Sequence, residues 1–258
     1  MSAESAHSWR QMGVNFAQDA RLALGLLCLD QDRAIMDEMM AYLPVALWAL
    51  HPVRIPSNDL FACKTAKAAT AILAEAVSLL PALGPNSTVC FGCTSSAMAL
   101  GPADISATLR GIRPEINVID PASSVLAALR AFGVNRIAVL SPYIDDTNAV
   151  FDAFLPRHGI AIVNRGSFKL VNEAAIPDIS PQAIYDAGVS IAKGAEALFI
   201  TCTGLRCSSV ISAIENATDI PVVASCQAMA WDAWSRHPRT HIPVGLGSLF
   251  GRIHDGAA

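Results

Sequence analysis

The chain has 258 residues, of which 53% are hydrophobic and 16% charged, and its formal net charge is −4. This length fits one large domain or two halves, and the apolar content indicates a folded protein with a substantial core. The weakly negative net charge gives no excess of basic residues that would bind the phosphates of a nucleic acid. Apolar runs such as 22–29 are far shorter than the ~20 residues that a membrane-spanning helix needs. We therefore expect neither nucleic acid nor a membrane as a partner.

Short apolar runs of strand length alternate with longer segments of helical pattern, which is typical of βα units on a parallel sheet. The stretch 62–80, for example, is too long for a strand and rich in Ala, Leu and Glu. The sequence therefore predicts the α/β class. The expected strands are Leu22–Leu29, Val45–Leu50, Thr88–Phe91, Ile116–Ile119, Arg136–Leu140, Ile160–Val163, Ala197–Thr201 and Pro221–Ala224.

An internal repeat divides this series in two. In each part a hydrophobic strand is followed by an acidic loop, at 30–32 and at 145–146, and then by a helix. Later in each part a strand runs directly into Cys-Thr, at Cys93-Thr94 and at Cys202-Thr203, at nearly the same offset. We expect two pseudo-symmetric half-domains, residues 1–133 and 134–258, each with a parallel sheet flanked by helices. The boundary between them is soft, because the chain can cross back at one end.

The cysteine content indicates a reducing compartment. Seven cysteines are an odd number and too few for a disulfide scaffold, so most should be free thiols. The apolar run 22–29 also lacks the flanks of a signal peptide, because Glu4 and Asp19 precede it and charged residues follow it. We expect a cytoplasmic protein.

Cys93 and Cys202 are the candidate chemical groups. In an open parallel sheet, ligands bind beyond the carboxyl ends of the strands, where both cysteines are expected. A thiol at a helix N-terminus there should have a lowered pKa, and the hydroxyl residues that follow can bind an anion. If the halves face one another, the two sulfurs approach a substrate from opposite sides. For Cys28, Cys63, Cys90 and Cys226 we favour the structural alternative, a small buried hydrophobic residue.

Other motifs give weaker signals. Cys90-x-x-Cys93 has the spacing of a zinc or redox motif, but Cys90 lies inside an expected strand and no second such pair follows. Gly245-x-Gly247 stands at the end of the chain without the helix that a dinucleotide fingerprint requires. We therefore expect no metal and no cofactor.

The ordered segments 91–96 (FGCTSS), 141–143 (SPY), 202–206 (CTGLR) and 221–228 (PVVASCQA) resemble those of the Asp/Glu racemase superfamily. Within it, the chain is most similar to the branch of maleate cis-trans isomerases, arylmalonate decarboxylases and EutA proteins. The resemblance runs from about residue 24 to residue 234.

This resemblance implies a cofactor-independent enzyme with its active site between two α/β halves, acting on a small carboxylate, and a homodimer. Cys93 and Cys202 would be the catalytic pair, as base and acid in a racemase or as nucleophile and assistant in an isomerase. The residues implied to contact the substrate are Thr94, Ser95, Tyr143, Asn172 and Thr203.

Some positions depart from the pattern of these relatives. The segment Asp30-Gln31-Asp32 replaces the Pro and Asn that maleate isomerases tend to show, and an acidic residue there would disfavour a second substrate carboxylate. Cys226 is a third thiol without an assigned role. Decarboxylases of the group have glycine where this chain has Cys93, which argues against decarboxylation.

Cis-trans isomerisation through a thiolate adduct is accordingly the leading hypothesis. Racemisation or epimerisation by two cysteines is the alternative. A decarboxylase and a small-molecule binding protein without catalysis are the weaker possibilities, since two α/β lobes around a cleft do not by themselves give chemistry.

Overall fold

The computed structural model describes residues 12–13, 15, 19–62, 65–84, 87–237 and 245–252. The first half forms a four-stranded parallel sheet in the order β2-β1-β3-β4. Its strands are β1 (Leu22–Leu29), β2 (Trp48–Ile55), β3 (Thr88–Gly92) and β4 (Asn117–Ile119). Strands β1 and β3 lie in the middle and are almost wholly buried, because both of their faces are covered.

The second half repeats this topology. Its four parallel strands are ordered β6-β5-β7-β8 and comprise β5 (Arg136–Tyr143), β6 (Ala161–Leu170), β7 (Ala197–Ile200) and β8 (Val222–Ala224). In each half the first strand pairs with the second on one side and the third on the other. The prediction of an α/β fold with a parallel sheet in each half is confirmed.

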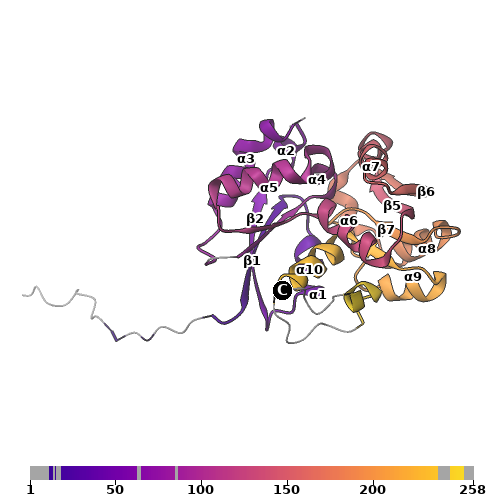
Figure 1. Ribbon diagram of the computed structural model, residues 1–258. Coiled ribbons are helices and arrows are strands. Elements are labelled where there is room, and N and C mark those ends of the chain that lie inside the picture. The colour runs from indigo at the N-terminus through magenta and orange to yellow at the C-terminus, as the bar shows by residue number, and fades with distance from the viewer. Residues whose placement is uncertain are drawn as a thin grey trace, which may run out of the picture.

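Helices flank both sheets (Figure 1). They are α1 (Ile35–Tyr42), α2 (Ser57–Ala62), α3 (Ala66–Ser78), α4 (Thr94–Leu100), α5 (Pro102–Ile112), α6 (Pro121–Phe132), α7 (Asp145–Arg157), α8 (Pro181–Ile191), α9 (Ile211–Thr218) and α10 (Ser225–Ser235), with 3-10 helices η1 (Glu173–Asp178) and η2 (Ser248–Arg252). Local sequence sets several of the helix starts. Thr65, Asp120 and Ser180 each accept a backbone N–H with the side chain at the N-cap.

Two helices cross between the halves. Helix α10 packs against α1, β3 and β4 of the first half, and α6 packs against β8 of the second. Figure 1 shows the orange α10 beside the indigo α1 of the first half, and the magenta α6 on the side of the second half. Trp234 of α10 meets Trp48 of β2 edge to face and donates its indole N–H to the Tyr42 carbonyl at 3.0 Å. These contacts join the two halves.

The largest differences from the predicted strand boundaries are in β2 and β6. Strand β2 starts at Trp48 rather than at Val45 and runs to Ile55, because residues 44–48 form a turn in which the Pro44 carbonyl accepts the N–H groups of Leu47 and Trp48. Strand β6 continues to Leu170, seven residues past the expected end. The extension places 164–170 beside β5, where it shapes the surroundings of Tyr143.

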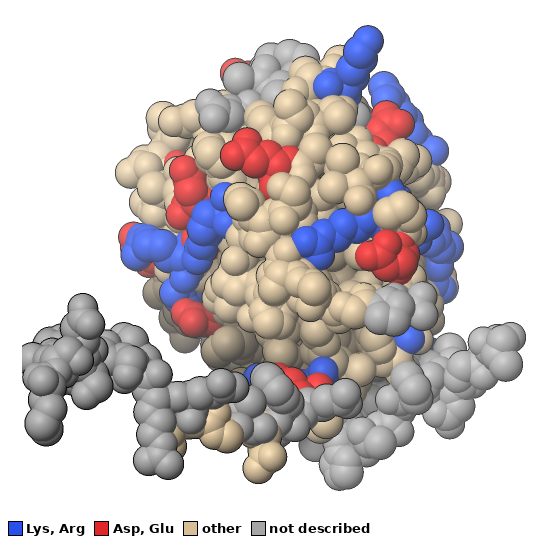
Figure 2. All heavy atoms as spheres, turned by 90° about the vertical axis from the view of Figure 1, so that its left-hand side faces the viewer, with Lys and Arg blue, Asp and Glu red and all other residues tan. Residues whose placement is uncertain are grey.

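Surface charge is mixed on the face of the molecule that Figure 2 draws. Figure 2 shows Lys and Arg interspersed with Asp and Glu over a mostly uncharged face. Within the described part of the chain, no helix is both long and apolar enough to cross a membrane.

Candidate active site

Cys93 and Cys202 line one pocket. Cys93 follows β3 directly, and Cys202 lies two residues after β7, so each sulfur comes from the same place in its own sheet. The pocket volume is about 30 Å³, room for roughly two water molecules. Its lining comes from both halves: Leu29, Gln31, Asp32, Phe61, Cys93, Ser95, Tyr143, Glu173, Ile176, Pro177, Cys202, Thr203 and Gly204.

Cys93 is the N-cap residue of α4 in extended backbone. Its side chain is 4% exposed, and its sulfur lies 3.1 Å from the Ser96 hydroxyl and 3.7 Å from the Ser95 hydroxyl. These two hydroxyls can donate to a thiolate, which partly offsets the cost of placing a charged sulfur in a buried position.

The sequence predicts that a helix starts at Cys202, but the structure has no helix there. Residues 201–210 form a loop, and α9 begins only at Ile211. Cys202 has φ +75, the left-handed region that non-glycine residues rarely adopt, and its sulfur accepts the Gly204 N–H at 3.3 Å. The turn at Gly204 therefore replaces the helix terminus as the donor to this sulfur.

The prediction of lowered thiol pKa values was wrong. Burial raises the pKa of Cys93, and it raises the pKa of Cys202 as well, where the Asp32 carboxylate adds to the effect. The hydroxyls near Cys93 and the Tyr143 hydroxyl near Cys202 act in the opposite direction but do not prevail. Desolvation outweighs the backbone and hydroxyl dipoles, so both groups are neutral thiols near pH 7.

Tyr143, the last residue of β5, lines the pocket beside Cys202. Its hydroxyl hydrogen-bonds the Cys202 sulfur, and burial raises the pKa of Tyr143 well above its usual range. The ring stacks on Phe151 of α7, with centroids 6.0 Å apart. The phenol therefore stays a neutral donor in the pocket lining near the Cys202 sulfur.

Asp32 and Thr203 connect the halves at the floor of the pocket. One Asp32 oxygen accepts the N–H groups of Ala34 and Ile35, both at 2.9 Å, and the other accepts the Thr203 hydroxyl at 2.8 Å. Thr203 also lies 3.3 Å from the Gly92 carbonyl, the residue before Cys93. The sequence predicts an acidic residue of the segment 30–32 near the substrate, and the structure places Asp32 in the pocket lining.

Thr94 and Ser95 differ in exposure to the pocket. The Ser95 side chain lines it, but the Thr94 hydroxyl donates to Ser225 of α10 at 2.9 Å and lies behind the lining. Cys226 also lies behind it, where its thiol donates to the Thr203 carbonyl at 3.4 Å. Thr94 and Cys226 thus support the residues that face the cavity.

Asn172 lies outside the pocket lining, and its neighbour Glu173 lies inside it. Asn172 is exposed and caps η1 by accepting the Ala174 N–H at 3.2 Å. Glu173 is half-buried, burial raises its pKa, and among the described residues its carboxyl has no hydrogen-bond partner. The structure therefore brings Glu173 to the pocket, a residue that the sequence analysis did not single out, and leaves the predicted Asn172 outside the lining.

The pocket is acidic. Asp32 and Glu173 line it, and no Lys, Arg or His of the described residues does. The hydroxyls of Ser95 and Tyr143 can donate to a substrate oxygen, whereas the Thr203 hydroxyl already donates to Asp32. In the described part of the chain, no group of three or more His, Cys, Asp and Glu side chains is placed to hold a metal ion.

A family model and a curated relative match part of the chain. The arylmalonate decarboxylase family model matches residues 113–250, a segment that includes Tyr143 and Cys202. The arylmalonate decarboxylase of Bordetella bronchiseptica is 31% identical over 114 residues, which cover 43% of this chain and 48% of that enzyme. The alignment thus spans about half of the relative's length.

Solved structures show the same fold over nearly the whole chain. A cysteine-to-alanine variant of the maleate isomerase Iso from Pseudomonas putida S16 with maleate matches with a TM-score of 0.75 and 17% identity, covering 89% of this chain and 97% of that one. A glycine-to-cysteine mutant of arylmalonate decarboxylase in its sulfate-associated form has a TM-score of 0.75 and 21% identity, covering 89% and 99%. A cysteine-to-serine mutant of Nocardia farcinica maleate cis-trans isomerase with a covalently bound succinylcysteine intermediate has a TM-score of 0.73 and 18% identity, covering 89% and 98%. The chain belongs to the arylmalonate decarboxylase family.

Proposed function

We propose that this protein is a cofactor-independent isomerase of a small carboxylate, in which Cys93 and Cys202 act on the substrate from opposite sides. One observation carries the proposal: a single pocket is lined by two thiols, each delivered by the equivalent strand of a different sheet. A decarboxylase needs one proton donor at the reacting carbon, whereas two opposed sulfurs suit a reaction that changes geometry or configuration.

Cys93 is the better nucleophile of the pair. Its sulfur has two hydroxyls within reach, whereas the sulfur of Cys202 lies near the Asp32 charge, which opposes ionisation. Because the resting thiol is neutral, a base must take its proton. The Glu173 carboxyl lines the same pocket, influences the Cys93 titration and has no other described partner. We therefore propose that the Glu173 carboxylate accepts the proton of the Cys93 thiol.

The reaction then balances in three steps. The Cys93 thiolate forms a carbon–sulfur bond at one carbon of the double bond, and the Cys202 thiol gives its proton to the other carbon. Rotation about the resulting single bond follows. Cys202 takes a proton back from the same carbon, the double bond re-forms, and the carbon–sulfur bond breaks to release the Cys93 thiolate. The succinylcysteine intermediate of the Nocardia farcinica enzyme supports such an adduct.

The substrate is bound by neutral donors. We assign one carboxylate of the substrate to the hydroxyls of Ser95 and Tyr143, while Thr94, Asn172 and Thr203 act through the local structure that their hydrogen bonds hold. Two protein carboxyls and no described cation line the pocket, so a second substrate carboxylate would be repelled. We therefore propose a monocarboxylate rather than maleate.

Racemisation or epimerisation uses the same two sulfurs, one removing a proton and the other delivering it from the opposite face. The product separates the reactions. Inversion exchanges the two configurations of a saturated carbon, which chiral chromatography follows, whereas adduct formation, rotation and elimination exchange the two geometric isomers of a double bond, which proton NMR follows. Inverted configuration of a saturated substrate, without a geometric isomer, would assign racemisation.

Decarboxylation is supported by the family match, which includes Cys202 but not Cys93. The discriminating variant is Cys93→Gly. An isomerase or a racemase loses its activity with this change, while a decarboxylase that needs only Cys202 keeps it.

The deciding experiment is an assay of unsaturated monocarboxylates, 2-substituted carboxylates and substituted malonates against the wild type, Cys93→Ser and Cys202→Ser. Cys28→Ala is the matched control, because Cys28 is a buried thiol that lies outside the pocket. We expect isomerised product with the wild type and the control, and a large loss with both serine variants. Retained isomerisation in either serine variant would contradict the two-thiol mechanism, and loss of carbon dioxide alone would assign decarboxylation.

A further inference from the structure

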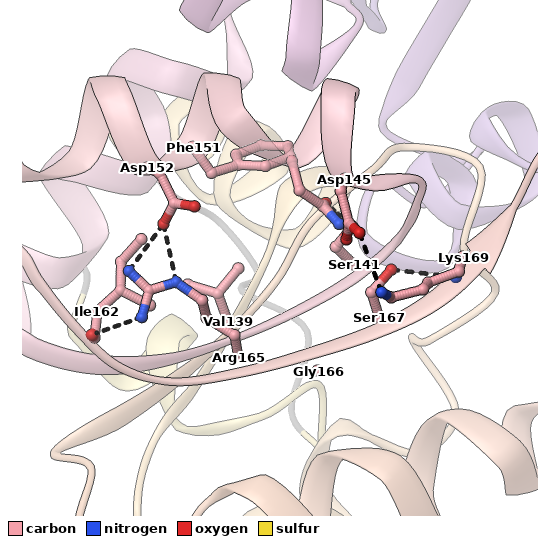
Figure 3. Close-up of a pocket in the computed structure, with 11 residues that line it drawn as sticks. Val139, Ser141, Asp145, Phe151, Asp152, Ile162, Arg165, Gly166, Ser167 and Lys169 are labelled. Atoms are coloured by element: carbon pink, nitrogen blue, oxygen red, sulfur yellow. Dashed lines mark hydrogen bonds and ion pairs between the residues drawn. The ribbon is translucent and has the colours of Figure 1, made fainter.

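A second cavity lies between α7 and β6 (Figure 3). Its volume is about 390 Å³, so it is far roomier than the pocket of the two thiols. The ring of Phe151 and the side chains of Val139 and Ile162 form its apolar part. We call it the α7–β6 cavity. It lies within the size range of small-molecule sites.

The lining of this cavity holds Tyr143 in place. The Tyr143 carbonyl accepts the Asn148 side-chain amide at 3.0 Å and also the Ser167 hydroxyl. The Tyr143 N–H donates to the Ser141 hydroxyl oxygen at 3.0 Å, and that hydroxyl donates to Asn148. Phe151, which forms one wall, stacks on the Tyr143 ring. A molecule in the cavity would therefore touch the groups that fix the phenol beside Cys202.

The backbone around the cavity is irregular. The pairing of β5 and β6 shifts register between Ser141 and Tyr143, and Lys169 adopts the left-handed region with φ +51. This turn sends the Lys169 N–H to the Ser167 hydroxyl at 3.1 Å and its ammonium to Asp145 at 3.0 Å. A register shift of this kind re-aims the side chains beside it, which brings Ser141, Ser167 and Lys169 to the wall of the cavity.

The charges of the cavity point to a zwitterion. An ion pair stands at each end, Arg165 with Asp152 at 2.8 Å and Lys169 with Asp145 at 3.0 Å (Figure 3). All four side chains are about half exposed or more, so these pairs are weak and open to exchange with a ligand. The balanced charge favours neither an anion nor a cation. A molecule with both charges can pair with Lys169 and Asp145 while an apolar group covers the Phe151 wall.

We propose that the α7–β6 cavity is a second binding site, that it takes a zwitterionic amino acid with an apolar side chain, and that its occupancy alters the active site through Tyr143. The site itself is independent of the reaction catalysed. Only the coupling rests on the proposed roles of Tyr143 and Cys202.

Binding is tested on the Cys93→Ser/Cys202→Ser double variant, so that turnover cannot interfere. L-Leucine is titrated by NMR beside 4-methylpentanoate, which lacks the ammonium, and 3-methylbutan-1-amine, which lacks the carboxylate. We expect each analogue to bind about tenfold more weakly, since each loses one charged partner. Lys169→Gln should weaken leucine binding by a similar factor, and Lys193→Gln, which changes an exposed lysine outside the cavity, should not. Equal binding of the three probes, no leucine binding, or unchanged binding to Lys169→Gln would overturn the site.

Coupling is tested on the wild type by following alkylation of Cys202 with iodoacetamide. Saturating leucine should change the rate at least twofold, and Lys169→Gln should remove the change while Lys193→Gln keeps it. A rate that leucine leaves unaltered, although it binds to the double variant, would overturn the coupling. Because this outcome concerns only the cavity, it leaves the test of the two-thiol reaction unaffected.

Discussion

The first half of the chain holds its thiol at the start of a helix, whereas the second half holds its thiol in a loop with left-handed backbone. The two sheets have the same strand order, and both sulfurs reach one pocket. Their neighbours differ, with two serine hydroxyls beside Cys93 and the Gly204 N–H and Tyr143 near Cys202. Duplicated topology thus gives matched positions, and local sequence gives each position its own chemistry.

The largest expected effect comes from removing either sulfur. Cys93→Ser and Cys202→Ser should each lower kcat by about 10²- to 10⁴-fold, because a hydroxyl is a far poorer nucleophile and acid than a thiol. Steady-state kinetics on the substrate found in the panel measures this loss. A trapped adduct in Cys202→Ser but not in Cys93→Ser, seen by mass spectrometry of the intact protein, would confirm the assignment of Cys93 as nucleophile. The reverse pattern would exchange the two roles.

The unlike surroundings of the two thiols also predict an order of alkylation. Both pKa values are raised by burial, so the thiolate fraction at a given pH is smaller than for an ordinary thiol near pKa ~8.5. The alkylation rate of each should therefore keep rising with pH beyond that range. We expect Cys93 to react several-fold faster than Cys202 at pH 9, because Asp32 opposes ionisation of Cys202. Peptide mapping after timed exposure to iodoacetamide checks this order.

Asp32→Asn should reduce the difference in alkylation rate between Cys93 and Cys202. The change removes the charge near Cys202 but keeps an oxygen for the N–H groups of Ala34 and Ile35. The pKa of Cys202 should fall, so its alkylation at pH 8 should quicken by several-fold while that of Cys93 changes little. The free energy of unfolding should drop by about 1 kcal/mol, because the Thr203 hydroxyl loses a charged acceptor. An unchanged rate at Cys202 would show that Asp32 does not control it.

The strand pattern and the two Cys-Thr segments were sufficient to predict the fold class and the pair of sulfurs, because buried parallel strands are continuous apolar runs and the repeat marks equivalent positions. The thiol pKa values could not be predicted. The N-terminus of a helix does favour a thiolate, as we expected for Cys93. The desolvation that outweighs this effect depends on how closely Glu173, Ile176 and Phe61 cover the pocket. These residues lie far from the cysteines in sequence, and no local motif reports their approach.

The smallest effect concerns the hydroxyl pair that ties the first thiol's helix to the second half. Thr94 of α4 donates to Ser225 of α10 at 2.9 Å, and both side chains are buried. Thr94→Val and Ser225→Ala should each destabilise the fold, and the double variant should lose about 1 kcal/mol less than the sum of the two, since a single buried hydrogen bond contributes about that much. Urea unfolding of the four proteins measures this coupling. Because the pair lies behind the pocket lining, alkylation of Cys202 should stay within about twofold in all four, and a larger change there would mean that the two sulfurs are linked through α10 as well as across the pocket.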